Sequence, residues 1–455
     1  MPDLKLVLLA ANLAFAALAV AVCCWRRYDF AVVLLGLSPL VGSAFIPNVE
    51  QNLEQIETDS GIGSYLRISL LMLIGAVGVL KFLQSKTRWK LPPHLILLGI
   101  FVTFALLSTS YSLDPQFTFI RAATGTAVFG CLLGLHAWLD RAERVDVVMK
   151  ALLVMVFIGT AANAASAFVL PQKAWDVLYR LQGLSSHPNM LGEAFMLAYP
   201  ILLWNYSRSD GLKRWFVLIL TASVFFLHVL TGSRGSLVPS ALLICIWFLV
   251  LRQWGRLICF TVSILIGGVL ILQLMPEKFE RPDNTDFSGL TDRPEFWAGA
   301  LQLILERPLQ GYGYGVEGKV WEDPRFQKAE YYLWAGSAKT SLHNGFLSVG
   351  IGGGLLVLAL WCTLLLGPLI RCFRLPADEY KAFGMCVIVS CLIHNFVETD
   401  ISIGGSTDTV FWIAWLIMGH DVLREATRRV TTHPITLAWA GVSEGSLQQQ
   451  NLGRL

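Results

Sequence analysis

Long apolar runs separated by short polar segments dominate the whole sequence. A helix needs about 20 apolar residues to cross hydrocarbon about 30 Å thick, because each residue rises about 1.5 Å. Runs of this kind lie near residues 4–24, 30–46, 64–83, 94–110, 117–139, 151–169, 189–206, 215–232, 236–251, 257–275, 343–369, 382–399 and 408–423. The pattern predicts an all-α polytopic integral membrane protein with about 12 transmembrane helices, or thirteen if every run spans.

The composition agrees with this class and excludes others. Of 455 residues, 35 are Lys or Arg and 32 are Asp or Glu, so 15% are charged, against roughly 25% in soluble domains. The formal net charge of +3 is too small to indicate a nucleic-acid surface, so we expect no nucleic-acid partner. The nine cysteines form no CxxC pair or Cys/His cluster, so neither a disulfide framework nor a zinc site is predicted.

The basic residues divide unequally between alternate short loops, which predicts the orientation of the chain because Lys and Arg are retained on the cytoplasmic side. The opposite short loops hold only Lys173, Arg180 and Arg234. The long hydrophilic segment between Pro276 and Leu342 is therefore predicted to lie outside the cytoplasm, which in a bacterium is the periplasm. One set of loops holds nineteen basic residues: Arg26, Arg27, Lys86, Arg88, Lys90, Arg141, Arg144, Lys150, Arg208, Lys213, Arg214, Arg252, Arg256, Arg371, Arg374, Lys381, Arg424, Arg428 and Arg429.

The long segment contains the signals of its own amphipathic helix. Asp292 and Glu295 have the spacing of a capping box, and Pro294 suits a first turn. Before Pro308 ends the pattern, one helical face collects Phe296, Trp297, Ala300, Leu301, Ile304 and Leu305. A tight turn is then predicted at Gly311, Gly313 and Gly315. The pattern therefore predicts that the segment forms a small folded lid.

These signals predict four parts of the chain. They are a transmembrane bundle at 1–275, the periplasmic lid at 276–342, C-terminal transmembrane helices at 343–425, and a mobile cytoplasmic tail at 426–455. The first apolar run lacks a basic leader and a small-residue cleavage site before Trp25, so we do not expect it to be a removed signal peptide.

Arginines outside the cytoplasmic set need a reason, because an arginine at a helix centre costs about 2.5 to 3.5 kcal/mol on insertion scales, and three of them stand out. Arg180 lies in YRLQGLSSHPN, Arg234 in LTGSRGS, and Arg293 at the start of the lid helix. A structural interpretation stays open for each: Arg180 snorkelling, Arg234 capping a helix, and Arg293 solvated. All three are predicted at the extracytoplasmic face.

A histidine–asparagine pair occurs where the lid re-enters the membrane, in SLHNGFLSVGIGGG. The imidazole of His343 can take a proton near physiological pH, although a lone histidine beside Asn344 can also be a helix cap. His394 and Asn395 repeat the pair on another helix, with Glu398 after them. This second pair can equally serve helix packing.

Arginines and a histidine on the outer face suit one kind of chemistry. Arginine forks bind phosphate oxygens bidentately and neutralise a diphosphate leaving group, and a histidine can deprotonate an attacking hydroxyl. No acidic pair is placed convincingly to hold a metal, and nucleotide sugars and ATP are absent outside the cytoplasm. A sugar activated by a lipid diphosphate is therefore the predicted donor class.

At these residues the sequence resembles the superfamily of O-antigen ligases (WaaL) and O-antigen polymerases (Wzy_C-like). The resemblance runs through RLQGLSSHPNMLGEAF, LTGSRGS, TDRPEFWAGALQLILERPLQGYGYG and SLHNGFLSVGIGGG, over residues 180–354. It implies an inner-membrane enzyme similar to glycosyltransferases of class C, which moves O-antigen from undecaprenyl diphosphate to lipid A-core oligosaccharide. The implied reaction inverts the anomeric centre without metal or cofactor, among membrane lipids.

The resemblance also implies roles for particular residues. We expect catalytic roles for His343, Arg234 and Arg293, and substrate binding by Arg180, Asn189, Trp297, Asn344, Gly311 and Gly313. Two departures stand out. The family's NPN-like tract reads SHPN here, which leaves the role of His187 open, and the family has twelve spans with both ends inside. One run, among the first two or around Gly232–Gly235, is therefore not expected to span.

Other functions stay open. An O-antigen polymerase uses the same donor with a second lipid-linked glycan as acceptor, and a protein O-glycosyltransferase belongs to the same class. A transporter of anionic lipid or solute would also place charges in the membrane, although the two halves show no repeat of the segment pattern.

Overall fold

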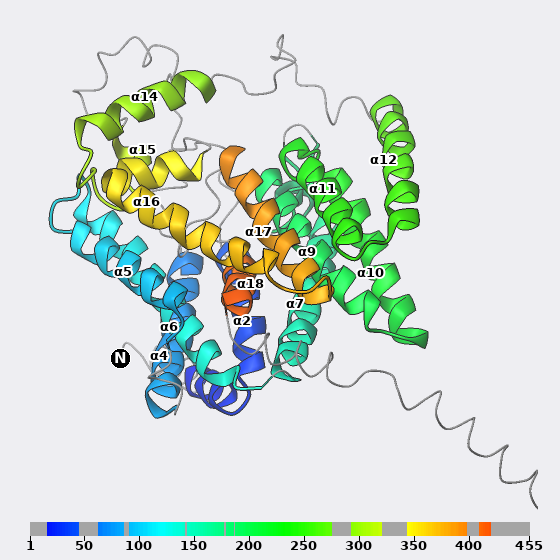
Figure 1. Ribbon diagram of the computed structural model, residues 1–455, viewed down its shortest axis with the longest axis horizontal. Helices are drawn as coiled ribbons and strands as arrows, with labels where there is room; N and C mark the ends of the chain where they lie inside the picture. Colours follow the sequence, from blue (N-terminus) through cyan, green and yellow to red (C-terminus); the bar gives the residue numbers. More distant parts are fainter. Residues whose placement is uncertain are drawn as a thin grey trace, which may run out of the picture.

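The computed structural model describes residues 16–44, 62–85, 91–141, 143–176, 179–185, 187–274, 293–320, 344–397 and 409–419. Nearly all of these residues are helical (Figure 1), and their only strand-like pairing is an isolated bridge between Trp175 and Leu181. The predicted all-α class is thus confirmed for this part of the chain. His343, Glu398 and the segment 426–455 lie outside the described residues.

Every predicted apolar run overlaps a helix in the described ranges. A short helix, Ala16–Arg26, is followed by α2 (Tyr28–Ala44), α4 (Ile62–Gln84), α5 (Pro93–Ser108), α6 (Pro115–Trp138), α7 (Glu143–Val169), α8 (Pro171–Ala174), α9 (Pro188–Ser207), α10 (Gly211–Leu230), α11 (Arg234–Val250), α12 (Trp254–Leu274), α14 (Arg293–Glu306), α15 (Glu317–Val320), α16 (Gly345–Phe373), α17 (Glu379–Val397) and α18 (Thr409–Gly419). Five of the described helices, α4, α6, α7, α10 and α16, are long and apolar enough to cross a membrane. This supports a multi-pass membrane protein, and the count of twelve stays a prediction.

Aromatic side chains join the C-terminal helices to α5 in the core. The ring centroids of Phe101 and Trp361 are 4.8 Å apart, and those of Trp361 and Trp412 are 5.8 Å apart. The indole of Trp415 donates to the Leu364 carbonyl at 2.7 Å, which satisfies its polar edge. The helices α5, α16 and α18 are thereby held together although they lie far apart in the sequence.

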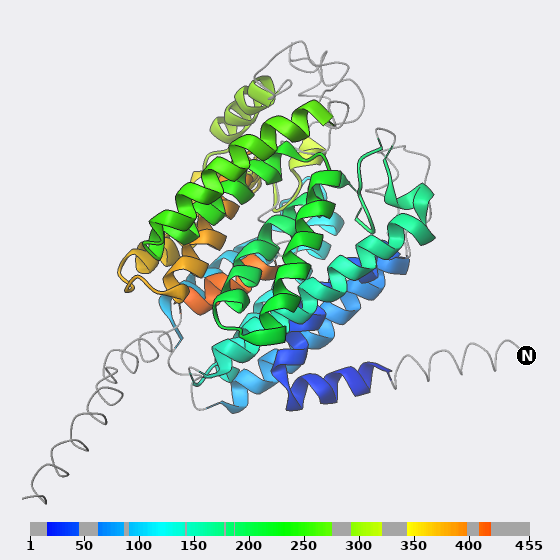
Figure 2. The same cartoon turned by 90° about the vertical axis from the view of Figure 1, so that its right-hand side faces the viewer.

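Basic residues from distant loops meet at one end of the bundle. Arg208, which follows α9, lies 3.1 Å from Asp146 of α7 and 3.9 Å from Glu379 of α17. Arg371 donates to the carbonyl of Gly419, so α16 and α18 end together. The arginines belong to the loops predicted to be cytoplasmic. In Figure 2 the helix Ala16–Arg26, in dark blue, lies across this end at an angle to α2.

At the opposite end, the chain after α14 is hydrogen-bonded to the turn between α5 and α6. The amide of Leu113 donates to the Tyr312 carbonyl at 3.1 Å, and the amide of Tyr314 donates to the Ser108 hydroxyl at 3.0 Å. The Thr118 hydroxyl donates to the Tyr314 carbonyl at 3.0 Å. Figure 1 shows α14 and α15 at this end, beside α16. The predicted lid helix is therefore followed by a segment that packs closely on the bundle.

The same segment fills a break in α16, which the sequence pattern predicted as one continuous run. Gly354 has non-helical angles, φ 70° and ψ −170°. The carbonyls of Ile351 and Gly352 accept the amides of Tyr312 and Gly313 at 2.9 and 3.0 Å. A broken helix is tolerated at membrane depth only where its backbone groups find partners, and residues 312–313 supply them here.

Candidate active site

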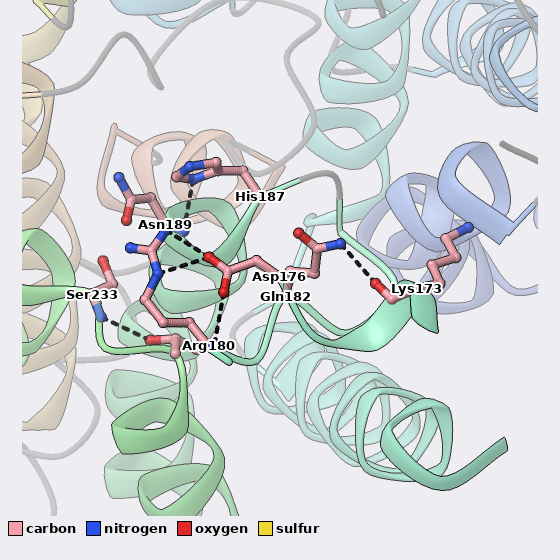
Figure 3. A network of polar contacts seen from close by, with 8 residues as sticks. Lys173, Asp176, Arg180, Gln182, His187, Asn189 and Ser233 are labelled. Carbon is pink, nitrogen blue, oxygen red and sulfur yellow. Dashed lines mark hydrogen bonds and ion pairs between the residues drawn. The ribbon is translucent and has the colours of Figure 1, made fainter. Parts of the chain in front are cut away.

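The loop between α8 and α9 is folded around a buried ion pair. Nη2 and Nε of Arg180 each lie 2.8 Å from Oδ2 of Asp176, whose Oδ1 accepts the backbone amide of Arg180 at 2.7 Å. The two side chains are 10% and 9% exposed. Figure 3 shows the pair among the polar residues of this loop. Arg180 is thus held in a folded loop instead of snorkelling, and its role in substrate binding stays a prediction.

Hydrogen bonds anchor this loop to two helices. The amide of Leu184 donates to Oδ1 of Asn163 in α7 at 2.8 Å, and the amide of Leu181 donates to the carbonyl of Leu230, at the end of α10, at 2.9 Å. Burial lowers the pKa of the nearby Lys173 ammonium group from its ordinary value. The loop is therefore fixed in position.

His187 caps α9, which gives the departure from the family tract a local explanation. Its Nδ1 accepts the amide of Asn189 at 3.2 Å, and Pro188 takes the first helical position, where a missing amide hydrogen is tolerated. Figure 3 shows His187, Asn189 and Ser233 gathered near the guanidinium of Arg180. The predicted residues Arg180 and Asn189 are thus brought together, and their role in substrate binding stays a prediction.

Arg234 is the first residue of α11, directly after the buried N-cap residue Ser233. Its side chain is exposed, and within the described ranges no ion pair or hydrogen bond joins its guanidinium to another residue. Helix N-termini favour anions through their free amides and dipole. Arg234 therefore presents a positive charge beside the Arg180 loop, where an anionic group can meet it.

The asparagines of the two histidine–asparagine pairs, Asn344 and Asn395, lie where the start of α16 meets the end of α17. Asn344 caps α16 by accepting the amide of Leu347 at 3.1 Å, and its Nδ2 donates to the Phe396 carbonyl at 3.2 Å. Asn395 is buried at the same place. The ring of Trp297, on the lid helix α14, lies edge-on to Phe396 with centroids 6.4 Å apart. Asn344 and Trp297 are thus brought to one cluster.

Several predicted groups lie outside what the structure describes. They are His343, the side chains of Arg293 and His394, and Glu398. The backbone of Arg293 is described and begins α14, as the capping signals predicted. Within the described ranges no group of three or more His, Cys, Asp or Glu is arranged to hold a metal ion; metal independence stays a prediction.

The structure assigns Gly311 and Gly313 a packing function. Both have positive φ, +64° and +113°. A methyl group on Gly311 would lie 2.4 Å from the Ile351 carbonyl oxygen, and one on Gly313 would lie 2.4 Å from the Ser112 hydroxyl. These glycines let the lid segment approach α16 and the α5–α6 turn. Substrate binding by them stays a prediction.

Sequence reasoning missed two polar residues buried near the outer end, Glu193 of α9 and His228 of α10. Both stand alone in apolar runs, in LGEAF and FLHVL. An ionisable residue inside a spanning run was the available signal, since such residues are expensive and tend to be functional.

Comparison with known proteins bears on the same segment. Residues 215–362 match the Wzy_C family, described as O-Antigen ligase. This segment of the chain is therefore similar to the O-antigen ligase domain of the Wzy_C family. The matched range includes Arg234, Arg293 and His343, and Arg180 precedes it. The predicted resemblance to the ligase and polymerase superfamily is confirmed.

The individual proteins that the chain resembles include both O-antigen ligases and an O-antigen polymerase. The chain is 25% identical to an O-antigen ligase of Pseudomonas aeruginosa, over 66% of this chain and 70% of that protein. It is 26% identical to an O-antigen ligase of Salmonella typhimurium, over 40% of this chain and 46% of that protein. An O-antigen polymerase of Salmonella muenchen is 20% identical over 66% and 75%.

Proposed function

We propose that this protein is an O-antigen ligase, which transfers O-antigen polysaccharide from undecaprenyl diphosphate to lipid A-core oligosaccharide in lipopolysaccharide biosynthesis. One observation carries the proposal: the Wzy_C match covers the segment that holds Arg234, Arg293 and His343, and Arg234 is exposed at a helix N-terminus beside the Arg180 loop.

The diphosphate of the donor is the group that the arginines recognise. Arg180 already has Asp176 as a partner at 2.8 Å, so this pair adds little net charge. Within the described ranges no ion pair engages the guanidinium fork of Arg234, and the first turn of α11 supplies backbone amides; together they favour the charge that develops on the leaving diphosphate. We expect Arg293, at the start of the lid helix, to contribute a second fork.

His343 acts as the general base of the transfer. The acceptor sugar hydroxyl attacks the anomeric carbon from the face opposite the diphosphate while its proton passes to the imidazole. The carbon–oxygen bond to the diphosphate breaks, and its electron pair leaves on the phosphate oxygen. This single displacement inverts the anomeric centre and uses neither metal nor cofactor. The bonds from Asn344 to Leu347 and Phe396 hold the helix that follows the base.

The proposed enzyme has twelve spans in the bacterial inner membrane, a class C-like frame, and an active site that faces the periplasm. Two observations support this placement. Residues of the predicted cytoplasmic loops meet at one end of the bundle, and the lid segment packs at the other. The helix Ala16–Arg26 lies across the basic end (Figure 2), which supports assigning the non-spanning run to the first one.

An O-antigen polymerase is the second candidate, because the similarity to the polymerase of Salmonella muenchen covers 75% of that protein. Both candidates use a lipid-linked diphosphate donor and differ in the acceptor. Purified protein in liposomes should therefore receive the donor with either lipid A-core or a second lipid-linked glycan. Glycan on lipid A-core supports the ligase, elongation of the lipid-linked glycan supports the polymerase, and movement of intact donor without transfer indicates a transporter.

The His343→Ala variant tests the assignment of the base in the same assay. Removing a general base costs typically 10²–10⁴ in rate, whereas removing a helix cap costs about 1 kcal/mol of stability. We expect the variant to fold, to bind the donor and to transfer almost no glycan. His433→Ala is the control, because His433 belongs to the predicted cytoplasmic tail, and it should keep its turnover. A folded His343→Ala variant that retains a third of the turnover would place the base elsewhere, with His394 or Glu398 next.

A further inference from the structure

A continuous chain of buried polar groups crosses α9, α10 and α11 beneath Arg234. The Tyr199 hydroxyl lies 3.3 Å from Nδ1 of His228, and Nε2 of His228 lies 2.8 Å from the Ser236 hydroxyl. The Ser236 hydroxyl donates to the Ser233 carbonyl at 3.1 Å. His228 and Ser236 have no exposed surface. The chain therefore links three helices inside the bundle.

One assignment of the hydrogen atoms gives every bond of this chain a donor. If the Ser236 hydroxyl donates to the Ser233 carbonyl, Nε2 of His228 is the donor to Ser236. In that neutral tautomer Nδ1 is an acceptor, and it takes the hydrogen of Tyr199. The reverse order would leave the Tyr199 hydrogen without an acceptor in this chain. The imidazole therefore links α9 to the start of α11.

The same histidine also fixes the turn between α10 and α11 through its backbone. The Thr231 hydroxyl donates to the His228 carbonyl at 2.7 Å and accepts the amide of Ser233 at 3.2 Å. Arg234 follows this turn directly. The direction in which α11 presents Arg234 thus depends on bonds made by both the ring and the backbone of His228.

The surroundings leave the polar chain little freedom. A methyl group on Gly192 of α9 would lie 2.3 Å from the Ser236 hydroxyl oxygen, so the two helices approach closely at that point. A fully buried imidazole is costly in a spanning helix, and hydrophobic packing of α10 needs no such group. The cost is understandable if the bonds of His228 serve the reaction.

We propose that His228 is a positioning residue of the glycosyl transfer: through Ser236 and Ser233 it holds the α10–α11 turn so that Arg234 meets the leaving diphosphate. The proposal rests on the proposed function, because it assigns the arginine to a donor diphosphate. It adds a residue that touches neither substrate and acts only through the position of Arg234.

Matched substitutions separate positioning from general packing. In His228→Gln the amide nitrogen can reach the place of Nε2 and donate to Ser236, whereas in His228→Asn it is too short. Ser236→Ala removes the acceptor of the same bond. Ser240→Ala is the control, because Ser240 is also buried on α11 but its hydroxyl donates to the Ser236 carbonyl of its own helix at 2.7 Å.

The kinetic test measures kcat and donor KM in liposomes. Removing one group that stabilises developing charge costs about 10²–10³ in kcat, so a displaced Arg234 should lose part of that. We expect His228→Asn and Ser236→Ala to lower kcat about 10-fold to 100-fold with KM changed less than about threefold. His228→Gln should stay within about threefold of the unaltered kcat, and the double variant His228→Asn with Ser236→Ala should lose no more than either alone.

A spectroscopic test reports the turn without any reaction. Gly235 is exposed, and a side chain built there meets no atom within 4 Å, so a nitroxide can be attached to a Gly235→Cys variant. The exposed Cys23 and Cys259 are replaced by serine, and the parent without the Gly235 substitution gives the background. We expect greater nitroxide mobility with His228→Asn or Ser236→Ala, and unchanged mobility with Ser240→Ala.

The outcomes separate the two proposals. If His228→Asn and Ser236→Ala match Ser240→Ala in kcat and mobility, the positioning role is overturned. It is also overturned if His228→Gln loses as much kcat as His228→Asn while both variants melt early, because that pattern marks a packing residue. If the unaltered protein transfers no glycan although the nitroxide mobility responds as expected, the proposed function is wrong. The result would then support only the dependence of the α10–α11 turn on His228 and Ser236.

Discussion

A methyl group at Gly311 should release the lid segment from the broken helix. A left-handed conformation, φ +64° here, costs a non-glycine residue about 1–2 kcal/mol. The added carbon would also lie 2.4 Å from the Ile351 carbonyl oxygen and 2.5 Å from the Gly352 carbonyl carbon. These are backbone atoms that cannot rotate away, and overpacking of this kind costs about 1–3 kcal/mol. The Gly311→Ala variant should therefore lose about 2–5 kcal/mol of lid docking.

Hydrogen exchange at two amides measures this loss directly. Tyr312 and Gly313 donate their amide hydrogens to Ile351 and Gly352, so their exchange reports the opening of this contact. A loss of about 2–5 kcal/mol corresponds to roughly thirtyfold to a few thousandfold faster exchange. Gly211→Ala is the matched control: its φ is +56°, but no atom lies within 4 Å of the added carbon.

The control separates backbone strain from the steric contact. Gly211→Ala should destabilise its own turn by about 1–2 kcal/mol and leave exchange at Tyr312 unchanged. Slow exchange at Tyr312 and Gly313 in a folded Gly311→Ala protein would refute the argument. Loss of glycan transfer with unchanged exchange would instead favour the predicted binding role of Gly311.

Three further predictions concern orientation, charge and the buried pair. Cysteines introduced by Asp286→Cys or Glu322→Cys, in a background without reactive native cysteines, should react with a membrane-impermeant thiol reagent in spheroplasts; protection until lysis would contradict the periplasmic lid. Transfer should survive EDTA but fall with Arg234→Ala and recover only partly with Arg234→Lys, since lysine lacks the fork; restoration of chelated enzyme by Mg²⁺ would disprove metal independence. Asp176→Asn should lower the free energy of unfolding by about 3–5 kcal/mol, because its buried arginine partner loses its counter-ion. Asp140→Asn, at a more exposed pair, should cost less than about 1 kcal/mol. Equal shifts of the melting temperature would show that burial of the pair does not matter here.

The sequence predicted the helices well because their signal is local. The lid helix illustrates this: capping residues predicted a start at Arg293 and Pro308 a stop, and α14 covers Arg293–Glu306. The break at Gly354 in α16 was not predicted, although GIGGG contained a hint. An unbroken apolar run predicts one continuous helix. The backbone amides that make the break tolerable belong to Tyr312 and Gly313, about forty residues earlier in the chain.

The site was predicted only in part for a similar reason. The arginines were found because a positive charge outside the cytoplasmic set is costly wherever it occurs. The pairing of Arg180 with Asp176 accompanies a bridge between Trp175 and Leu181, which no periodic pattern predicts. The bond between His228 and Ser236 spans a turn between two apolar runs, and hydropathy treats such runs as uniform. Polar contacts that depend on how a turn folds therefore escaped the prediction.

The bonds between residues 312–313 and the break of α16 also bear on the order in which the protein is made. A helix with open carbonyls at Ile351 and Gly352 is a poor candidate for release into lipid by itself. The residues that cover those carbonyls precede α16 in the chain, so they leave the ribosome first. Residues 312–313 are therefore synthesised before the break of α16 that they cover. A circular permutant that reversed this order should insert α16 inefficiently, even though every final contact is unchanged.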